Sequence, residues 1–299
     1  MSSCTHIILK SRGLIGVTGD DAIDFLQGLV SNDVTKVSPD NAIYSALLTP
    51  QGKFLYDFFL VSLNDGLAID CETDRLDDLK RKLSMYKLRS KVDLTDLSGD
   101  FCVAALMGEN VIEQIELINA EGSAKGYLDG VAYVDPRLKD IGVRTILPRE
   151  GAIEALTTAG FPSGNPEDYE NLRLELGLPD GSRDLEVDKA ILLENGFNEL
   201  HGVDWDKGCY MGQELTARTH YRGLVKKRLM PVSVEGPLPA PGTSLMVGDK
   251  VAGEMRSGTG DKGLALVKLE HFASGDDMTA EGAVLHPLKP DWADFNIEP

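Results

Sequence analysis

The chain has 299 residues, of which 42% are apolar and 26% are charged, with a mean hydropathy of −0.14. This composition excludes a generally disordered protein, and the length suits about two domains. The 48 acidic residues outnumber the 30 basic ones and give a net charge of −18, which excludes a protein that coats nucleic acid or anionic membranes with its whole surface. No apolar run approaches the ~20 residues of a membrane-spanning helix, so no membrane contact is expected.

The N-terminus shows neither a secretory signal nor a transit peptide, so we expect a cytoplasmic protein, or a mitochondrial matrix protein if the source is eukaryotic. The four cysteines, at positions 4, 71, 102 and 209, form no CxxC pair, which indicates free thiols in a reducing compartment. Cys102 reads as a core residue, Cys71 as the structural end of a strand, and Cys4 as part of a fraying terminus. Only Cys209 has unusual neighbours.

The first hundred residues predict strands and helices that alternate at short spacing. This spacing favours an α+β fold over a wholly parallel sheet. The expected elements are a strand at 14–17, a helix with Ala22, Phe25, Leu26 and Leu29 on its apolar face, a hairpin of 42–48 and 54–61 turning at 49–52, a strand at 67–71, and a helix from Asp74 with Leu76, Leu79, Leu83 and Tyr86 on one face.

Residues 101–163 predict a second α+β layer. Its expected elements are a strand at 101–107, a helical stretch at 111–117, strands near Val131 and Ile141, and a helix at 149–160. A further helix begins at Asn165 or Glu167 and ends before Gly177 and Pro179, and the chain is then rich in loops.

Residues 224–299 predict a small antiparallel barrel, from short alternating strands at 229–234, 244–247, 251–255 and 264–269. The GxGxxG match at 258–263 continues as a strand and not as a helix, so it predicts a hairpin turn and not a dinucleotide site. The five histidines are scattered without an i, i+4 pair, and no metal site is expected.

The densest chemistry lies at residues 206–214, DKGCYMGQE. Two nearby glycines let the backbone bend around Cys209, while Lys207 and a helix starting near Gly212 favour a thiolate. The alternative is a glycine-rich turn with an incidental cysteine, made less reactive by Asp206 and Glu214. The residue pattern leaves both open.

A basic segment follows, in which Arg218, Arg222, Lys226, Lys227 and Arg228 stand without an acid among them. Such segregation on an acidic chain suggests an anionic partner, for example carboxylates, phosphates or an RNA backbone. An acidic face of the same chain is the alternative, and spacing alone favours it.

The stretch Lys207 to Glu214 resembles the K-G-C-[YF]-x-G-Q-E signature of the YgfZ family, folate-binding relatives of the glycine cleavage T-protein that include mitochondrial iron–sulfur assembly factors. The signature is long and specific. Supporting stretches cover essentially the whole chain, namely Phe25 to Gly28 with Asn32 and Asp33, Leu48 to Asp57, Arg173 to Pro179, and Val251 to Glu254.

The resemblance implies a T-protein-like fold with two α+β lobes around a central channel and a small C-terminal antiparallel β-barrel. The implied boundaries are 1–223 for the folate-binding region, with its second lobe at roughly 92–163, and 224–299 for the barrel. It also implies a tetrahydrofolate cofactor and a role in making or repairing [4Fe–4S] proteins, with iron–sulfur client enzymes, including tRNA-modifying ones, and the assembly machinery as partners.

By the same resemblance Glu194 occupies the place of the pterin-binding acid. A carboxylate suits this role, because it can accept both hydrogen-bond donors of the pterin edge. Arg218 or Arg222 would meet the glutamyl tail. The other residues that the resemblance assigns to the folate site are Asn32, Tyr210, Gln213 and Glu214, and those assigned to chemistry are Cys209, Lys207 and Asp57.

The chain departs from the T-protein pattern after Gly52, where Tyr56 and one acid, Asp57, stand in place of an acidic pair. Around Glu194 it reads Leu-Leu-Glu-Asn where Leu-Pro-Gln-Glu is frequent. We therefore expect an assembly factor, with a folate-dependent one-carbon (aminomethyl-type) transferase that uses Asp57 as the alternative. An adaptor that contacts tRNA through residues 218–228 is a third hypothesis.

Overall fold

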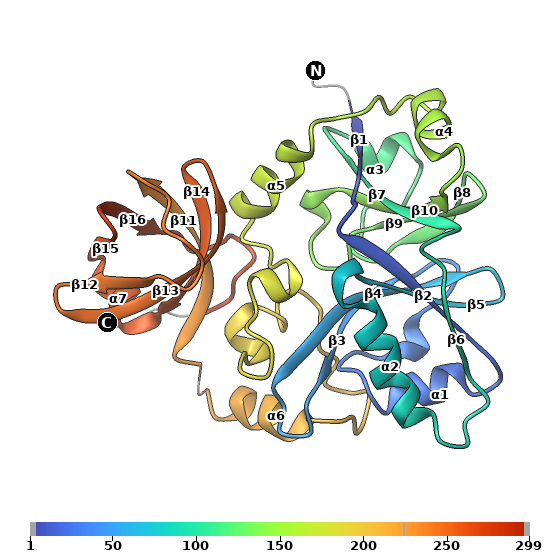
Figure 1. Ribbon diagram of the computed structural model, residues 1–299, viewed down its shortest axis with the longest axis horizontal. Coiled ribbons are helices and arrows are strands. Elements are labelled where there is room, and N and C mark those ends of the chain that lie inside the picture. The colour runs from blue at the N-terminus through green and yellow to red at the C-terminus, as the bar shows by residue number, and fades with distance from the viewer. Residues whose placement is uncertain (1–3, 224, 296–299) are drawn as a thin grey trace. The chain divides into compact units, whose positions relative to one another are not determined.

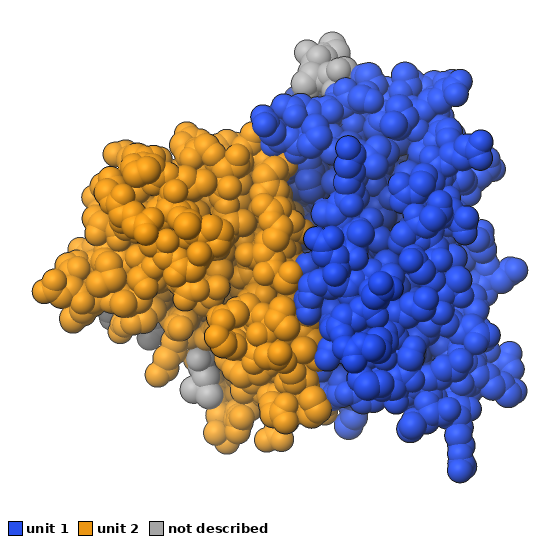
Figure 2. All heavy atoms as spheres, viewed as in Figure 1, with its two compact units in different colours: residues 1–48, 56–169, 200–211 blue, residues 49–55, 170–199, 212–299 orange. Residues whose placement is uncertain are grey.

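The computed structural model describes residues 4–223 and 225–295 (Figure 1). The chain divides into two compact units (Figure 2). Unit 1 comprises 1–48, 56–169 and 200–211, and unit 2 comprises 49–55, 170–199 and 212–299. The units do not follow the expected boundaries, because 49–55, 170–199 and 212–223 group with the barrel. Leu224, the expected first barrel residue, and residues 1–3 and 296–299 lie outside the described residues.

The first sheet of unit 1 has the strand order β3-β4-β5-β2-β6 (Figure 1). Its strands are β2 (Arg12–Thr18), β3 (Ile43–Leu48), β4 (Phe54–Leu63), β5 (Gly66–Glu72) and β6 (Asp93–Asp96), and its helices are α1 (Ala22–Gln27) and α2 (Leu76–Lys87). The hairpin predicted at 49–52 is confirmed as the β3–β4 connection. Helix α2 packs on β2 at Gly13, where a Cβ would lie 2.7 Å from Leu76 Cδ1. Tyr86, predicted on the buried face of α2, is 40% exposed.

The second sheet of unit 1 has the order β1-β7-β10-β9-β8. Its elements are β1 (Thr5–Ile8), β7 (Phe101–Met107), α3 (Val111–Gln114), β8 (Ala124–Tyr127), β9 (Gly130–Val134), β10 (Val143–Pro148) and α4 (Ala152–Thr158). The strand predicted near Ile141 is β10, which begins at Val143 because Ile141 itself closes a 3₁₀ turn. The strands β1, β6 and β8 have four residues each, too few for a clear alternating pattern.

Unit 2 contains the barrel, which closes in the order β11-β14-β13-β12-β15-β16 and so confirms the predicted antiparallel barrel. Its elements are β11 (Lys227–Glu235), β12 (Ser244–Val247), β13 (Lys250–Thr259), β14 (Lys262–Lys268), α7 (Leu269–Ser274), β15 (Met278–Ala280) and β16 (Ala283–Pro287). The GxGxxG stretch forms the β13–β14 hairpin as predicted, since Gly258 pairs with Gly263. Helix α5 (Pro166–Glu175) leads into unit 2, and α6 (Gln213–Tyr221) precedes the barrel.

Three of the four cysteines are buried, and the predictions of a core Cys102 and a structural Cys71 are confirmed. The prediction of a fraying Cys4 is wrong. Cys4 is 7% exposed and its thiol donates to the carbonyl of Glu109 at 3.1 Å, because β1 begins directly after it and pairs with β7. Along 4–223 and 225–295, no helix combines the length and the apolar character needed to cross a bilayer.

Candidate functional site

The cysteine loop, Leu200–Met211, belongs to unit 1 and ends in the first half of the motif. Cys209 is its exposed thiol, whereas Cys4, Cys71 and Cys102 are buried. Burial raises the pKa of the Cys71 thiol to about 12 and also raises the pKa of Cys4 and of Cys102. Among the four thiols, Cys209 is therefore the accessible one.

Lys207 is held on the backbone of a neighbouring segment. Its Nζ donates to the carbonyls of Val30 at 2.5 Å and Asn32 at 2.8 Å, and lies 5.2 Å from the ring centre of Tyr210. Burial lowers the pKa of Lys207 to about 8, against the opposing influence of the Asp33 and Asp204 carboxylates. The ammonium thus has two carbonyl acceptors and an aromatic face as its neighbours.

The amide of Asn32 is engaged within unit 1. Its Nδ2 donates to the carbonyls of Tyr44 and His201, both at 2.7 Å, and its Oδ1 accepts from the backbone N–H of Asp33 at 2.8 Å. An amide nitrogen carries two hydrogens, and both have an acceptor here. The side chain predicted to contact folate therefore holds two protein segments together.

Asp57 lies on β4 and is only 3% exposed. Its Oδ2 accepts from the hydroxyl of Tyr44 at 2.8 Å, and burial together with the Asp57 charge raises the pKa of Tyr44 above its ordinary range. The neighbouring Tyr56 is also buried, and its hydroxyl donates to Asp78. Asp57 is therefore part of the interior of unit 1.

Sequence reasoning missed a buried ion network beside Asp57. Asp70 accepts from Arg12 Nε at 2.6 Å and from Arg144 Nη2 at 2.7 Å, which joins β5 of one sheet to β10 of the other. Phe59 lies among the guanidinium groups, with Arg144 4.1 Å from its ring centre. Burial raises the pKa of Asp70, but Arg12 and Arg144 outweigh it and hold that pKa below its ordinary value.

Glu194 lies in unit 2, on the 3₁₀ turn Leu192–Asn195. Its carboxylate lines a cavity of about 270 Å³ and makes no hydrogen bond or ion pair with the described residues. Burial raises the pKa of Glu194, although Lys227, Lys53 and Arg228 act in the opposite direction. The lining of this cavity consists of Asp184, Glu186, Lys189, Ala190, Glu194, Asn195, Lys227, Val251, Gly253, Glu254, Arg256, Leu266 and Lys268.

The turn that carries Glu194 is held by segments distant in sequence. Phe54 exchanges backbone hydrogen bonds with Ala190 and Asp188, and α6 contacts the turn itself. The hairpin tip reaches the start of α6 at Gly52, whose φ of +82° and whose approach to the Gly212 carbonyl both require glycine, because a Cβ there would lie 2.6 Å from that oxygen. This packing explains how Lys53 comes close enough to act on Glu194.

Helix α6 begins at Gln213 as predicted and carries Glu214 in its first turn. Arg218, Arg222, Lys226 and Lys227 are exposed and form no ion pair with a carboxylate among the described residues. Arg228 differs, since it is buried and pairs with Glu199 at 2.8 Å. The alternative of an acidic face of the same chain is therefore confirmed for Arg228. Lys227 also lies near a carboxylate, because it lines the cavity with Glu194 and acts to lower the pKa of that group. For Arg218, Arg222 and Lys226 both interpretations stay predictions.

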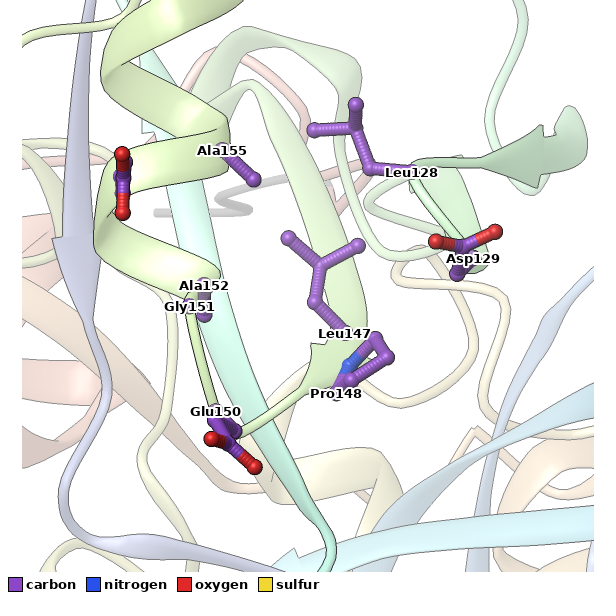
Figure 3. A pocket seen from close by; sticks show the side chains of 9 residues that line it. Leu128, Asp129, Leu147, Pro148, Glu150, Gly151, Ala152 and Ala155 are labelled. Atoms are coloured by element: carbon purple, nitrogen blue, oxygen red, sulfur yellow. The ribbon is translucent and has the colours of Figure 1, made fainter.

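Neither a metal-binding cluster nor a cavity elsewhere in the described residues contains the predicted site residues. The described residues contain no group of three or more His, Cys, Asp or Glu side chains able to hold a metal ion. Unit 1 has a hollow of about 340 Å³ with apolar Leu147, Pro148 and Leu128 beside Asp129 and Glu150 (Figure 3). None of the residues predicted from the sequence lines it.

The predicted site residues thus fall into two groups. Unit 1 brings together Asn32, Asp57, Lys207 and Tyr210, connected through Tyr44, with Cys209 in the same loop. Unit 2 holds Glu194 and the α6 residues Gln213, Glu214, Arg218 and Arg222. The boundary between the units falls inside the motif, between Met211 and Gly212.

Comparison with known proteins supports the two-part architecture. The GCVT N-terminal domain matches residues 8–125, and the CAF17 C-terminal beta-barrel domain matches residues 226–295. The structure of the glycine cleavage system aminomethyltransferase T from Bartonella henselae superposes with a TM-score of 0.78 over 97% of this chain and 86% of that chain, at 15% identity. The predicted T-protein-like fold is confirmed.

Two curated relatives match nearly the whole chain. The mitochondrial iron–sulfur cluster assembly factor IBA57 of Mus musculus is 35% identical, and that of Homo sapiens is 34% identical. Each match covers 95% of this chain and 84% of the relative. With both the barrel and the N-terminal region matched as well, the chain belongs to the family of the iron–sulfur cluster assembly factor IBA57.

Proposed function

We propose that this protein is a tetrahydrofolate-binding accessory factor for the assembly or repair of [4Fe–4S] proteins. Its family supports the role in assembly. The observation that carries the folate assignment is the Glu194 carboxylate, which faces a cavity and lacks an internal partner among the described residues. Glu194 is half-buried, and a carboxylate that has lost part of its contact with water is stabilised by a ligand that donates to it.

The residues around the cavity suit the pterin head of a folate. The pterin edge presents two N–H donors, which the Glu194 carboxylate can accept together. Val251 and Leu266 supply apolar surface, and a volume of about 270 Å³ suits the bicyclic head and not the whole molecule. Bound tetrahydrofolate would supply a carrier for one-carbon units.

The rest of the folate molecule needs cations for its carboxylates. Arg218 and Arg222 are exposed on α6 without an acidic partner among the described residues, and we assign the glutamyl tail to them. Tyr210, Gln213 and Glu214 stay predicted contacts. Asn32 is a weaker candidate, because both hydrogens of its amide already have acceptors.

Cys209 is the residue that we propose meets the iron–sulfur cargo. It is exposed while the other three thiols are buried. Protein-bound [4Fe–4S] clusters ordinarily use four thiolates, so a single cysteine can act only as a nucleophile or a transient ligand whose co-ligands come from a partner. Lys207, which lies two residues earlier, holds the loop and is the predicted accessory residue at this site.

The clients that we propose are iron–sulfur enzymes, tRNA-modifying ones among them, in keeping with the YgfZ-like signature. The named relatives are mitochondrial proteins. A mitochondrial matrix and a bacterial cytoplasm both keep thiols reduced, and the free cysteines suit either compartment.

The test combines a calorimetric titration with tetrahydrofolate and a client-enzyme assay in a strain that lacks this protein. The parent should bind folate and restore the client, and Cys209→Ser should abolish the restoration while folate affinity stays within about twofold, because serine is a far poorer nucleophile and metal ligand at neutral pH. Restoration by the serine variant at the parent's level would refute the role of the thiol. A parent without folate affinity would refute the cofactor.

The alternative is a one-carbon transferase that uses Asp57. Its carboxylate would have to meet the folate nitrogens and an amine carrier, yet it is buried in unit 1 and accepts from Tyr44. Steady turnover of an aminomethyl-lipoyl substrate, lost in Asp57→Asn, would establish this alternative. We expect no such turnover.

A further inference from the structure

The cysteine loop contains no helix or strand, so its shape depends on contacts made by side chains and single backbone groups. Many of these contacts come from one short segment, residues 28–32, which follows α1, and others come from Lys36 and from the carbonyl of Pro136. Ser31 Oγ donates to the Gly202 carbonyl at 2.6 Å, and the N–H of Asp204 donates to the Ser31 carbonyl at 3.1 Å. These bonds fix the first part of the loop.

The second part of the loop is anchored on both sides of the thiol. Two residues before Cys209, Lys207 Nζ donates to the carbonyls of Val30 and Asn32. Two residues after it, the N–H of Met211 donates to the Gly28 carbonyl at 3.1 Å. Cys209 is therefore an exposed residue between two anchored ones, because Lys207 and Met211 both bond to residues 28–32.

Asn32 connects the cysteine loop to the sheet below it. One amide hydrogen goes to Tyr44 in β3 and the other to His201 in the loop. His201 has a φ of +55°, a backbone conformation that residues other than glycine seldom adopt. Asn32 Nδ2 donates to the carbonyl of this residue. A side chain with these partners orients the loop and has no donor to spare for a ligand.

We propose that Asn32 and Lys207 are positioning residues that clamp the cysteine loop onto residues 28–32. The clamp holds the Cys209 thiol at a fixed, exposed place where a partner can reach it. This role rests on the proposed function of Cys209. The proposed clamp distinguishes the accessibility of the thiol from its position. Accessibility is enough for reaction with small reagents, whereas a partner that supplies the remaining cluster ligands needs the thiol at a fixed place.

Hydrogen exchange of the full chain, read by mass spectrometry, tests the clamp directly. In Lys207→Gln the amides of residues 208–211 should exchange about tenfold faster or more, with β7 unchanged, because both carbonyl bonds are lost. Lys207→Arg should restore protection, since a guanidinium retains the charge and several donors. Lys36→Gln is the matched control, because Lys36 pairs with Asp204 of the same loop but its side chain is 57% exposed, and we expect less than a twofold change.

Asn32→Asp provides a second, independent variant, since it replaces the amide donor by a carboxylate that faces two carbonyls. Both variants should support an iron–sulfur client at least fivefold less well than the parent, while Cys209 still reacts with iodoacetamide at the parent's rate or faster. Unchanged exchange at 208–211 in Lys207→Gln, or full client support in both variants, would overturn the clamp. Full support by Cys209→Ser would instead refute the proposed function and leave the exchange result standing.

Discussion

Asp70 in unit 1 is fully buried and Glu194 in unit 2 is half-buried, and their pKa values shift in opposite directions. Burial acts on both carboxyl groups in the same sense, toward the neutral form. Asp70 has Arg12 and Arg144 within hydrogen-bond distance and its pKa is lowered, whereas Glu194 has cations nearby that do not bond to it and its pKa is raised.

This difference separates a structural carboxylate from the one that we propose binds a ligand. The Asp70 network is complete within unit 1, and it ties the two sheets together through β5 and β10. The Glu194 carboxylate borders a cavity and lacks a partner in the described residues. Loss of Asp70 should therefore harm folding, and loss of Glu194 should harm binding.

The largest effect is expected for Asp70→Asn. It leaves two buried guanidinium groups without their carboxylate, and removal of one partner from a buried ion pair costs about 3–5 kcal/mol of unfolding free energy. Denaturant unfolding followed by circular dichroism measures this. Asp93→Asn is the control, because Asp93 pairs with Lys87 at the surface and its loss should cost less than about 1 kcal/mol. Equal costs for both variants would contradict the distinction.

Glu194→Gln should show the reverse behaviour. Its unfolding free energy should stay within about 1 kcal/mol of the parent, while tetrahydrofolate affinity falls roughly tenfold to a hundredfold, because a lost charge-assisted hydrogen bond costs about 1.5–3 kcal/mol. Glu186→Gln is a matched control, since Glu186 lines the same cavity but pairs with Lys189. Calorimetry that gives both variants the parent's affinity would remove Glu194 from the binding site.

Lowering the pH should weaken folate binding in the parent, because it protonates Glu194. The Glu194→Gln variant should lack this part of the pH dependence. The pterin donors need the carboxylate form, and the folded-state pKa of Glu194 is raised, so protonation competes with the ligand at a higher pH than for an ordinary glutamate. The affinity should be constant above that pKa and fall by up to about tenfold per pH unit below it. For folding the sign is opposite: the raised pKa favours the folded state at low pH, and that contribution is lost as the pH rises through it.

The smallest effect concerns the exposed cations of α6. If Arg218 and Arg222 hold the glutamyl tail, additional glutamates should tighten binding a few-fold at low salt, and the gain should shrink as salt screens exposed charges. Replacement of both arginines by alanine should remove the gain, whereas Arg89→Ala, an exposed arginine of unit 1, should not. Saturable, salt-sensitive tRNA binding that the double variant loses would assign these arginines to RNA.

Local patterns predicted the elements whose signals are contained in a few consecutive residues. Thr49 to Gly52 has the chemistry of a turn and forms one, and Gly177 ends α5 with a φ of +71°. The barrel strands from β11 to β14 alternate clearly, but β15 has three residues and carries too little pattern to be found. The same limit hid β1, and with it the burial of Cys4.

The candidate site was predictable as a set of residues and not as an arrangement. The KGCYMGQE stretch identifies Cys209 and the start of α6. It gives no indication that Lys207 binds carbonyls 177 and 175 residues away, or that the amide of Asn32 reaches His201. Contacts between distant segments depend on how the loops close over the sheets, which no local pattern encodes.

Composition, alternation and one signature therefore determined the net negative charge, the α+β class with its barrel, and which segment is the candidate for chemistry. The tertiary structure decided which charges are satisfied. Arg12 and Arg144 reach Asp70 across 58 and 74 residues, Arg228 finds Glu199, and Glu194 finds no partner among the described residues. The reason is physical: the free energy of a charge depends on its burial and its neighbours, and folding sets both by bringing distant residues together.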